Sequence, residues 1–236
     1  MQAALTGEKP ELSRGGWPRR WVLIGAGAAL ALVLLVGIVW FSPLLAARTI
    51  EVRGQAAVPE EQIRNFARVP KGQPLLRVDT DAAARRVAAL PRVAKARVQR
   101  VYPSTVRITV TERVAAVFFD TADGPHLMDA DGVEFAIEPA PPGVPRLQVD
   151  TPGRDDPATK AVLEVLRALP PQLRGQLKEA AAKSISDIRL TLADDRVVLW
   201  GSREHTDRKA SVAVPLLTQP GKVYDVSSPD LPVVKQ

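Results

Sequence analysis

An uninterrupted apolar run at residues 21–41 constrains this chain more than any other feature of its sequence. The run reads WVLIGAGAALALVLLVGIVWF and contains no charged residue and no proline. As an α-helix rising about 1.5 Å per residue it would be about 31 Å long, which matches the roughly 30 Å hydrocarbon core of a bilayer. Trp21 and Trp40 stand at its ends, where indole rings favour the membrane–water interface. The sequence therefore predicts a single transmembrane helix over residues 21–41.

The charges on either side of this segment indicate its orientation. Four Lys or Arg residues lie in the twenty positions before it, and two lie in the twenty positions after Phe41. Because positive side chains are retained in the cytoplasm, we expect residues 1–20 to be a disordered cytoplasmic tail and the rest to lie outside, a single-pass type II arrangement in the plasma membrane. A cleaved signal peptide is the alternative. Its apolar region would be shorter, about 7 to 15 residues, and Leu45-Ala46-Ala47 is a poor cleavage site.

Composition narrows the function of the exterior part. The chain has no cysteine, which excludes disulfides, thiolate metal sites and cysteine nucleophiles. The net charge of the whole chain is +6, and leaving out the four cationic and two acidic residues of the tail gives +4, spread along the exterior part without a basic stripe, so we expect no nucleic-acid partner. Anionic partners at the outer face of a membrane, such as lipid headgroups or cell-wall polymers, fit this weak positive excess better.

Residues 48–114 are expected to form a first α+β module. Apolar and polar residues alternate around Ile50, and again over residues 93–102 and 105–114, which predicts three strands. Helical spacing predicts one helix beginning at Pro59 and a second over residues 82–90, capped from the stretch Asp79-Thr80-Asp81. The order is strand, helix, helix, strand, strand, with both helices on one face of the sheet.

Residues 115–236 are expected to form a second module, mixed α/β and dominated by antiparallel strands. Short apolar runs separated by Asp123-Gly124 and Asp131-Gly132 predict hairpins, and alternation predicts strands over residues 188–192 and 197–200.

Helical spacing in this second module predicts three helices. One covers residues 157–169, and Leu173, Leu177 and Ala181 indicate another after the two prolines at 170 and 171. The last covers residues 206–218, capped by Thr206 or Ser202 and kinked or shortened by a proline at 215. The predicted fold class is α+β, with one transmembrane helix, a βααββ module and this second domain.

Two groups of motifs give these modules a family resemblance. The stretch VQRVYPSTVRITVTERVAAV, at the end of the βααββ order, resembles the POTRA domain of the FtsQ/DivIB family of bacterial cell-division proteins. Tyr102 stands where that family usually has tryptophan or another aromatic residue. LMDADGVEF, PPGVPRL, residues 206–209 and the DVSSP string resemble the carboxy-terminal half of the family, especially in its actinobacterial members. The resemblance covers nearly all of residues 21–235.

The resemblance implies a role rather than a reaction. It implies a POTRA domain at residues 48–114 that serves recruitment, and a β domain at residues 115–236 that captures FtsB/DivIC and FtsL. The chain would be a non-enzymatic bitopic scaffold at the division septum, working with other membrane proteins of the divisome in septal peptidoglycan synthesis. Two alternatives stay open, a membrane-tethered cell-wall enzyme and a POTRA-bearing export or assembly component. The latter would need further POTRA repeats or a long barrel.

Candidate catalytic and metal-binding residues are few. The acidic stretch from Asp129 to Glu138 has some spacing of a calcium loop, but its Asp-Gly pair between apolar runs favours a hairpin turn. His126 and His205 are the only histidines, and no Gly-x-Ser-x-Gly elbow is present. Gly25-Ala26-Gly27 lacks the strand and helix of a dinucleotide loop. We expect no catalytic residue, metal or cofactor.

The carboxy-terminal tail offers a binding mechanism instead. Pro232 cannot donate a ladder hydrogen bond, which favours a strand at the edge of a sheet, where a partner can add a further strand. The alternative is that the tail only completes the sheet. The candidate partner-binding residues are Tyr224, Asp225, Val226, Leu231 and Val233.

The apolar run also carries two pairs of small residues at four-residue spacing. Gly25 with Ala29, and Gly27 with Ala31, would let another membrane helix approach closely. Glycine and alanine are common in such helices in any case, so the pairs favour a helix-packing face without establishing one.

Overall fold

The structure is a computed structural model, and it describes residues 19–41 and 45–236. The predicted cytoplasmic tail, residues 1–20, lies outside the described residues except for its last two positions. Backbone contacts divide the chain into two units. The first is made of Met1–Ile50, Pro70–Val78 and Arg100–Val106, and the second of Glu51–Val69, Asp79–Gln99 and Arg107–Gln236.

Helix α1, Arg19–Phe41, covers the apolar run. Within the part of the chain that the structure describes, no helix combines the length and the apolar character required to cross a membrane. The four small residues of the predicted packing face, Gly25, Gly27, Ala29 and Ala31, lie on α1 and are exposed. The membrane anchor therefore stays a prediction from the sequence.

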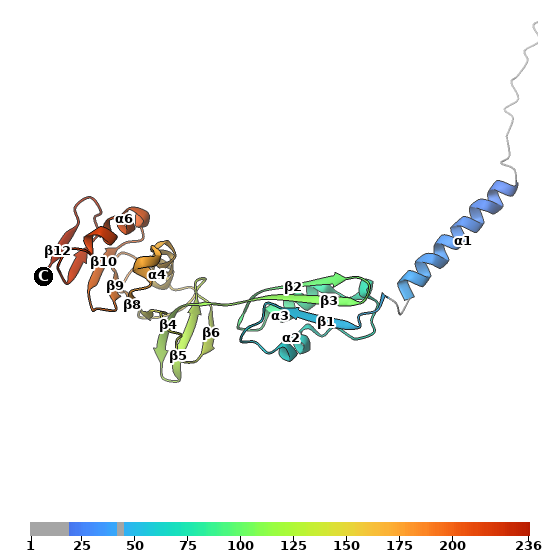
Figure 1. The fold of residues 1–236 in the computed structure, drawn as a ribbon, viewed down its shortest axis with the longest axis horizontal. Helices are drawn as coiled ribbons and strands as arrows, with labels where there is room; N and C mark the ends of the chain where they lie inside the picture. The colour runs from blue at the N-terminus through green and yellow to red at the C-terminus, as the bar shows by residue number, and fades with distance from the viewer. Residues whose placement is uncertain (1–18, 42–44) are drawn as a thin grey trace, which may run out of the picture. The chain divides into compact units, whose positions relative to one another are not determined.

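A three-stranded sheet with two helices follows, in the predicted order. Its strands are β1 (Thr49–Arg53), β2 (Val93–Val101) and β3 (Thr105–Glu112), and they lie in the order β1-β3-β2. Its helical segments, drawn alongside the sheet in Figure 1, are α2 (Glu60–Ala67), the 3-10 turn η2 (Leu75–Arg77) and α3 (Thr80–Ala88).

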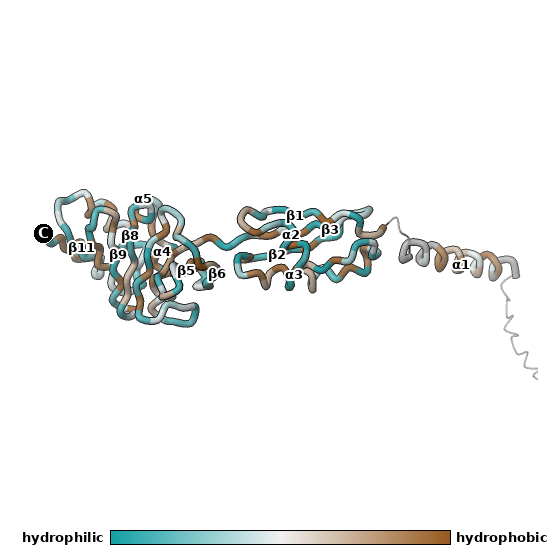
Figure 2. The backbone as a smooth tube through the Cα atoms, turned by 90° about the horizontal axis from the view of Figure 1, so that it is seen from below, coloured by the Kyte–Doolittle hydropathy of each residue, from teal (hydrophilic) through white to brown (hydrophobic). Residues whose placement is uncertain are grey.

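Local chemistry explains the ends of these elements. Of the predicted stretch Asp79-Thr80-Asp81, Asp79 is the cap of α3: its carboxylate accepts a hydrogen bond of 2.9 Å from the Ala82 N–H, which lowers the pKa of Asp79. Pro59 occupies the N-cap position of α2 without a side-chain cap bond, so the helix begins one residue later than predicted. Hydrophilic and hydrophobic stretches alternate along the strands (Figure 2), and every second side chain of β3 from Val106 to Val110 is buried. Burying each such side chain contributes about 1.5–3 kcal/mol.

The rest of the chain builds a nine-stranded mixed sheet around which three helices are arranged. The strand order is β12-β11-β10-β9-β8-β7-β4-β5-β6. Its strands are β4 (Ala115–Thr121), β5 (Gly124–Asp129), β6 (Glu134–Ile137), β7 (Arg146–Gln148), β8 (Leu177–Ala182), β9 (Ile188–Leu192), β10 (Val197–Gly201), β11 (Val223–Asp225) and β12 (Val233–Lys235). Both predicted hairpins are present, since β4–β5 and β5–β6 pair antiparallel. Antiparallel pairs predominate, but β4–β7, β7–β8 and β10–β11 are parallel.

The helices of this domain are α4 (Pro157–Ala168), α5 (Pro171–Arg174) and α6 (Thr206–Leu216). Figure 1 shows α4 and α6 against the half of the sheet that contains β8 to β12. One hydrophobic core joins them, and its members include Val162, Val165, Leu166, Leu190, Trp200, Ala210, Ala213 and Tyr224. The tail of the chain is thus part of the same packed domain as α4 and α6.

Two local predictions are wrong. The helix expected through Leu173, Leu177 and Ala181 ends at Arg174, and Leu177–Ala182 is strand β8. Helix α5 stops at its C-cap residue Gly175, and pairing with β7 and β9 then overrides the helical spacing of the residues that follow. Helix α6 is not capped by Thr206 or Ser202, since His205 occupies the cap position in a left-handed conformation without a side-chain cap bond.

Candidate partner-binding edge

Strand β12 ends the nine-stranded sheet on the side that contains the carboxy terminus. It pairs antiparallel with β11, in the register Val223 with Lys235, Tyr224 with Val234 and Asp225 with Val233. Strand β11 in turn pairs parallel with β10. Among the described strands none lies beyond β12, so half of its backbone N–H and C=O groups face away from the sheet. Pro232, predicted to lie within a terminal strand, immediately precedes β12, which is the last strand of the sheet on this side.

The two faces of this strand pair differ in burial. Tyr224 and Val234 share the face that packs on the core, where Tyr224 is 1% exposed and Val234 is half-buried. Val233 shares the opposite face with Asp225 and is 48% exposed. Leu231, in the loop before β12, is 79% exposed. An apolar patch of two side chains therefore lies beside unpaired backbone groups.

The structure brings together only part of the predicted site. Asp225, Leu231 and Val233 are accessible, but Tyr224 and Val226 are buried in the core, Val226 completely. A partner of the folded protein cannot reach these two side chains. Alternation in the sequence shows that neighbouring residues point to opposite faces, but it does not say which face is covered.

Tyr224 holds the tail to the domain. Its hydroxyl lies 2.7 Å from the Gln219 carbonyl oxygen and 2.9 Å from that of Gly221, and it donates to this pair of acceptors. The guanidinium of Arg196 lies over its ring, 5.7 Å from the centroid. The role of Tyr224 is therefore to fix β11, and thereby the strand beside it.

Several contacts that set the path of the tail have no signal in the sequence. The Val226 N–H donates to the Leu199 carbonyl oxygen at 3.0 Å, which continues the line of β11 past its end. The carboxylate of Asp225 accepts from the Ser227 N–H at 3.0 Å and from its hydroxyl at 2.7 Å. Arg208 of α6 forms an ion pair with Asp230. These contacts direct the loop so that β12 returns along β11.

Gly221 is required by the approach of β12. A Cβ at this position would lie 2.4 Å from Val234 Cγ1 and 3.3 Å from the Lys235 carbonyl oxygen. Such distances are shorter than van der Waals contact. Only glycine therefore lets β12 pack at this point without a shift.

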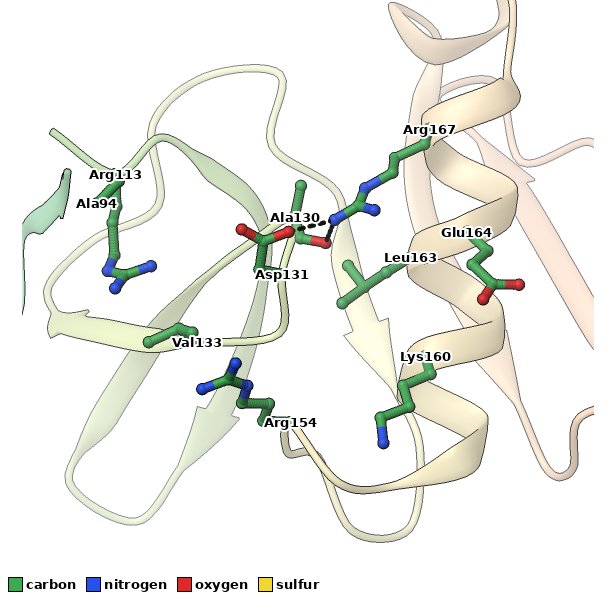
Figure 3. A pocket seen from close by; sticks show the side chains of 10 residues that line it. All are labelled: Ala94, Arg113, Ala130, Asp131, Val133, Arg154, Lys160, Leu163, Glu164 and Arg167. Carbon is green, nitrogen blue, oxygen red and sulfur yellow. Dashed lines mark hydrogen bonds and ion pairs between the residues drawn. The ribbon is translucent and has the colours of Figure 1, made fainter. Parts of the chain in front are cut away.

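A hollow of about 420 Å³ lies between the β5–β6 turn and α4 (Figure 3). Its walls are Ala94, Arg113, Ala130, Asp131, Val133, Arg154, Lys160, Leu163, Glu164 and Arg167. Most of these charges are paired: Arg113 with Asp129, Arg167 with Asp131, and Glu164 with Arg203. The lining residues include no hydroxyl nucleophile and no imidazole, and the two carboxylates among them, Asp131 and Glu164, are each held in an ion pair.

The remaining sequence candidates have structural roles. The carboxylate of Asp129 accepts from the Asp131 and Val133 N–H groups, both at 2.9 Å, and so forms the predicted hairpin turn. His126 lies in β5 with its Nδ1 2.6 Å from Glu134 and its Nε2 3.0 Å from Asp123. Burial opposes protonation of His126, but the hydrogen bonds to the two carboxylates outweigh it and raise its pKa. With both ring nitrogens engaged, His126 is not available as a general base.

Comparisons with known proteins agree with the two modules. Residues 45–113 match the family described as "POTRA domain, FtsQ-type", and residues 116–231 match "Cell division protein FtsQ/DivIB, C-terminal". Cell division protein FtsQ of Mycolicibacterium smegmatis is 53% identical over 215 residues, which are 91% of this chain and 64% of that protein. The protein of the same name from Corynebacterium glutamicum is 32% identical over 220 residues, or 92% of this chain and 99% of that one.

Among solved structures, the major extracytoplasmic domain of the cell division protein DivIB from Geobacillus stearothermophilus is similar to part of this chain. The similar region is 41% of this chain and 85% of the DivIB chain. The TM-score is 0.33 and the identity is 18%, so the sequence matches alone carry the assignment.

Proposed function

Because the chain belongs to the FtsQ/DivIB family of bacterial cell-division proteins, we propose that it is a non-enzymatic scaffold of the division machinery. It would bind homologues of FtsB/DivIC and FtsL outside the cytoplasmic membrane and help to organise septal peptidoglycan synthesis. The POTRA domain, residues 48–114, would serve recruitment, and the β domain, residues 115–236, would bind the partners.

The observation that carries the partner-binding proposal is the unpaired outer side of β12. A segment of the partner adds to β12 as a further strand, and its backbone hydrogen bonds supply affinity that depends little on sequence. Specificity comes from the two exposed apolar side chains at this edge, Leu231 and Val233. Tyr224 and Val226 contribute by fixing the position of the strands and make no contact with the partner.

The membrane anchor is the second part of the proposal. It rests on the apolar sequence of residues 21–41. Residues 21–41 would hold the chain in the membrane as a type II protein at the division septum, with Gly25, Gly27, Ala29 and Ala31 packing against another membrane helix. Tethering raises the effective concentration of partners in the same membrane, so that a short edge strand suffices for binding.

A test of the edge has to leave the core intact. Deleting residues 223–236 would remove the buried Tyr224 and Val226 and damage the core. We would instead substitute Leu231→Asp and Val233→Asp together in the full chain. Co-purification with the FtsB/DivIC homologue should fall at least tenfold, since apolar interface residues that matter contribute more than about 1 kcal/mol each.

Ile185→Asp is the matched control. Ile185 is 54% exposed and belongs to the same domain but lies between β8 and β9. It should leave capture unchanged. If the Leu231 and Val233 double variant captured the FtsB/DivIC homologue as well as the unsubstituted chain does, partner addition at β12 would be refuted. Turnover of muropeptides by the purified chain would favour the enzyme instead.

A further inference from the structure

Three segments distant in sequence meet where the chain emerges from the apolar run. The Ala47 N–H donates to the Gln73 carbonyl oxygen at 2.8 Å, and the Gly72 N–H donates back to the Ala47 carbonyl oxygen at 2.9 Å. The Arg48 N–H donates to the Ser104 carbonyl oxygen at 2.9 Å. Residues 45–50, 70–78 and 100–106 are thus fixed to one another, and all belong to the first structural unit.

These three segments carry charge of one sign. They contain four cationic residues and no Asp or Glu. All four cationic residues are exposed, namely Arg48, Lys71, Arg77 and Arg100. The guanidinium of Arg100 donates to the Leu75 and Val78 carbonyl oxygens at 2.8 and 2.6 Å, and these neutral acceptors leave its positive charge in place.

Two exposed apolar side chains accompany the charges. Tyr102, in the turn between β2 and β3, is 56% exposed, and Leu76 of η2 is 38% exposed. Tyrosine has an apolar ring and a polar tip, which suits the boundary between lipid and water. We call Arg48, Lys71, Leu76, Arg77, Arg100 and Tyr102 the basic surface.

Chain connectivity limits the distance between this surface and the proposed anchor. Helix α1 ends at Phe41, and residues 46 and 47 already belong to the hydrogen-bonded base of the three segments. The four residue-to-residue steps from Phe41 to Leu45 span at most about 14 Å even when fully extended. If α1 is held in a membrane, the basic surface lies within reach of the headgroups of that same membrane.

We propose that the basic surface binds the anionic headgroups of the membrane that holds α1, and so fixes the orientation of the POTRA domain on the bilayer. The inference rests on the anchor proposed above and adds a second contact with the lipid. Cationic side chains near an anionic leaflet each increase the contacting population about fivefold, and Leu76 and Tyr102 add apolar contact.

The test uses the absence of cysteine from the chain. Leu76→Cys in the full chain provides a single attachment point for a polarity-sensitive fluorophore, and Ile185→Cys provides a control position in the β domain. Each labelled chain is inserted into nanodiscs of phosphatidylcholine with and without phosphatidylglycerol. We expect the label at 76 to shift to the blue and to be quenched by brominated lipid when phosphatidylglycerol is present. Raised salt should reverse the effect, because the Debye screening length shortens from about 8 Å at physiological ionic strength to about 3 Å at 1 M.

Charge reversal makes the test specific. Lys71 is exposed and forms no ion pair with another described residue, so Lys71→Glu changes the charge by two without breaking a contact. The contacting population relative to the free one should fall about thirtyfold. Lys95→Glu makes the same change at an exposed position of β2 and should have little effect.

The outcomes separate this inference from the proposed function. A label at 76 that behaves as the one at 185 in both lipids refutes the inference, as does an equal loss from Lys71→Glu and Lys95→Glu. Failure of the chain to insert into nanodiscs refutes the anchor, and the inference falls with it. Capture of the FtsB/DivIC homologue on the same nanodiscs reports on β12 separately, so either proposal can fail without the other.

Discussion

Glu112, at the end of β3, holds the loop between β1 and α2 by accepting hydrogen bonds from three consecutive backbone N–H groups. Its carboxylate lies 2.7 Å from the Ala56 nitrogen, 3.0 and 3.1 Å from that of Ala57, and 3.0 Å from that of Val58. Burial opposes ionisation of Glu112, but these donors outweigh it and hold the pKa of the carboxyl below its usual value of 4.5. We therefore expect Glu112 to determine the local stability of this loop.

The size of the effect follows from the number of donors. A hydrogen bond to a charged acceptor contributes about 1.5–3 kcal/mol. Because Glu112 is half-buried, water can partly replace these hydrogen bonds in the variants. We therefore take the net stabilisation as about 1 kcal/mol for each N–H group. Glu112→Ala should then reduce the protection of the three amides from hydrogen exchange about 100-fold. Glu112→Gln keeps neutral acceptors and should reduce it about tenfold.

The measurement is hydrogen exchange of residues 56–58 in the full chain, followed by mass spectrometry. Glu61→Gln is the control, because Glu61 is an exposed residue of α2 and the change is chemically the same. Since the pKa of Glu112 is lowered on folding, its stabilisation is present above pH 4.5 and is lost as the pH falls through the lower pKa of the folded state. Glu112→Gln should abolish that pH dependence. Unchanged protection in both Glu112 variants would refute the reasoning.

Two further predictions concern the β domain. Gly221→Ala should displace β12, because the added methyl meets Val234, and overpacking of about 1–3 kcal/mol should speed exchange of the β12 amides tenfold or more; Gly153→Ala, which has open space, should not. The pKa of His126 is raised on folding, so its stabilisation is present below pH 6.5 and is lost as the pH rises through the folded-state value. The melting temperature of the native chain should therefore fall as the pH rises above 6.5 and through the folded-state pKa of His126, because the β4–β6 region loses this stabilisation. His126→Gln should make that pH dependence disappear.

Local patterns in the sequence were sufficient to predict much of the fold. Alternation in residues 93–102 and 105–114 predicted β2 and β3, and the Asp-Gly pairs predicted the hairpins of β4, β5 and β6. These patterns are readable because each strand buries one face, and each turn requires particular backbone angles. Motif order alone also led to the family that the comparisons show.

Patterns failed where partners distant in sequence decide the outcome. Residues 177–182 have apolar spacing compatible with a helix, but β7 and β9 lie on either side of them and make them strand β8. The cap of α6 depends on the left-handed backbone of His205, for which no side-chain pattern exists. Propensity is a weak guide when tertiary pairing opposes it.

The candidate edge shows the same division between the two sources. By itself, the sequence determined that the tail is strand-forming and that Pro232 favours an edge, because proline lacks the donor a central strand needs. Only the tertiary structure decided that Tyr224 and Val226 face the core while Leu231 and Val233 face solvent. Which side chains are buried depends on which side of the sheet α4 and α6 cover. That packing joins segments distant in sequence, and no local pattern encodes it.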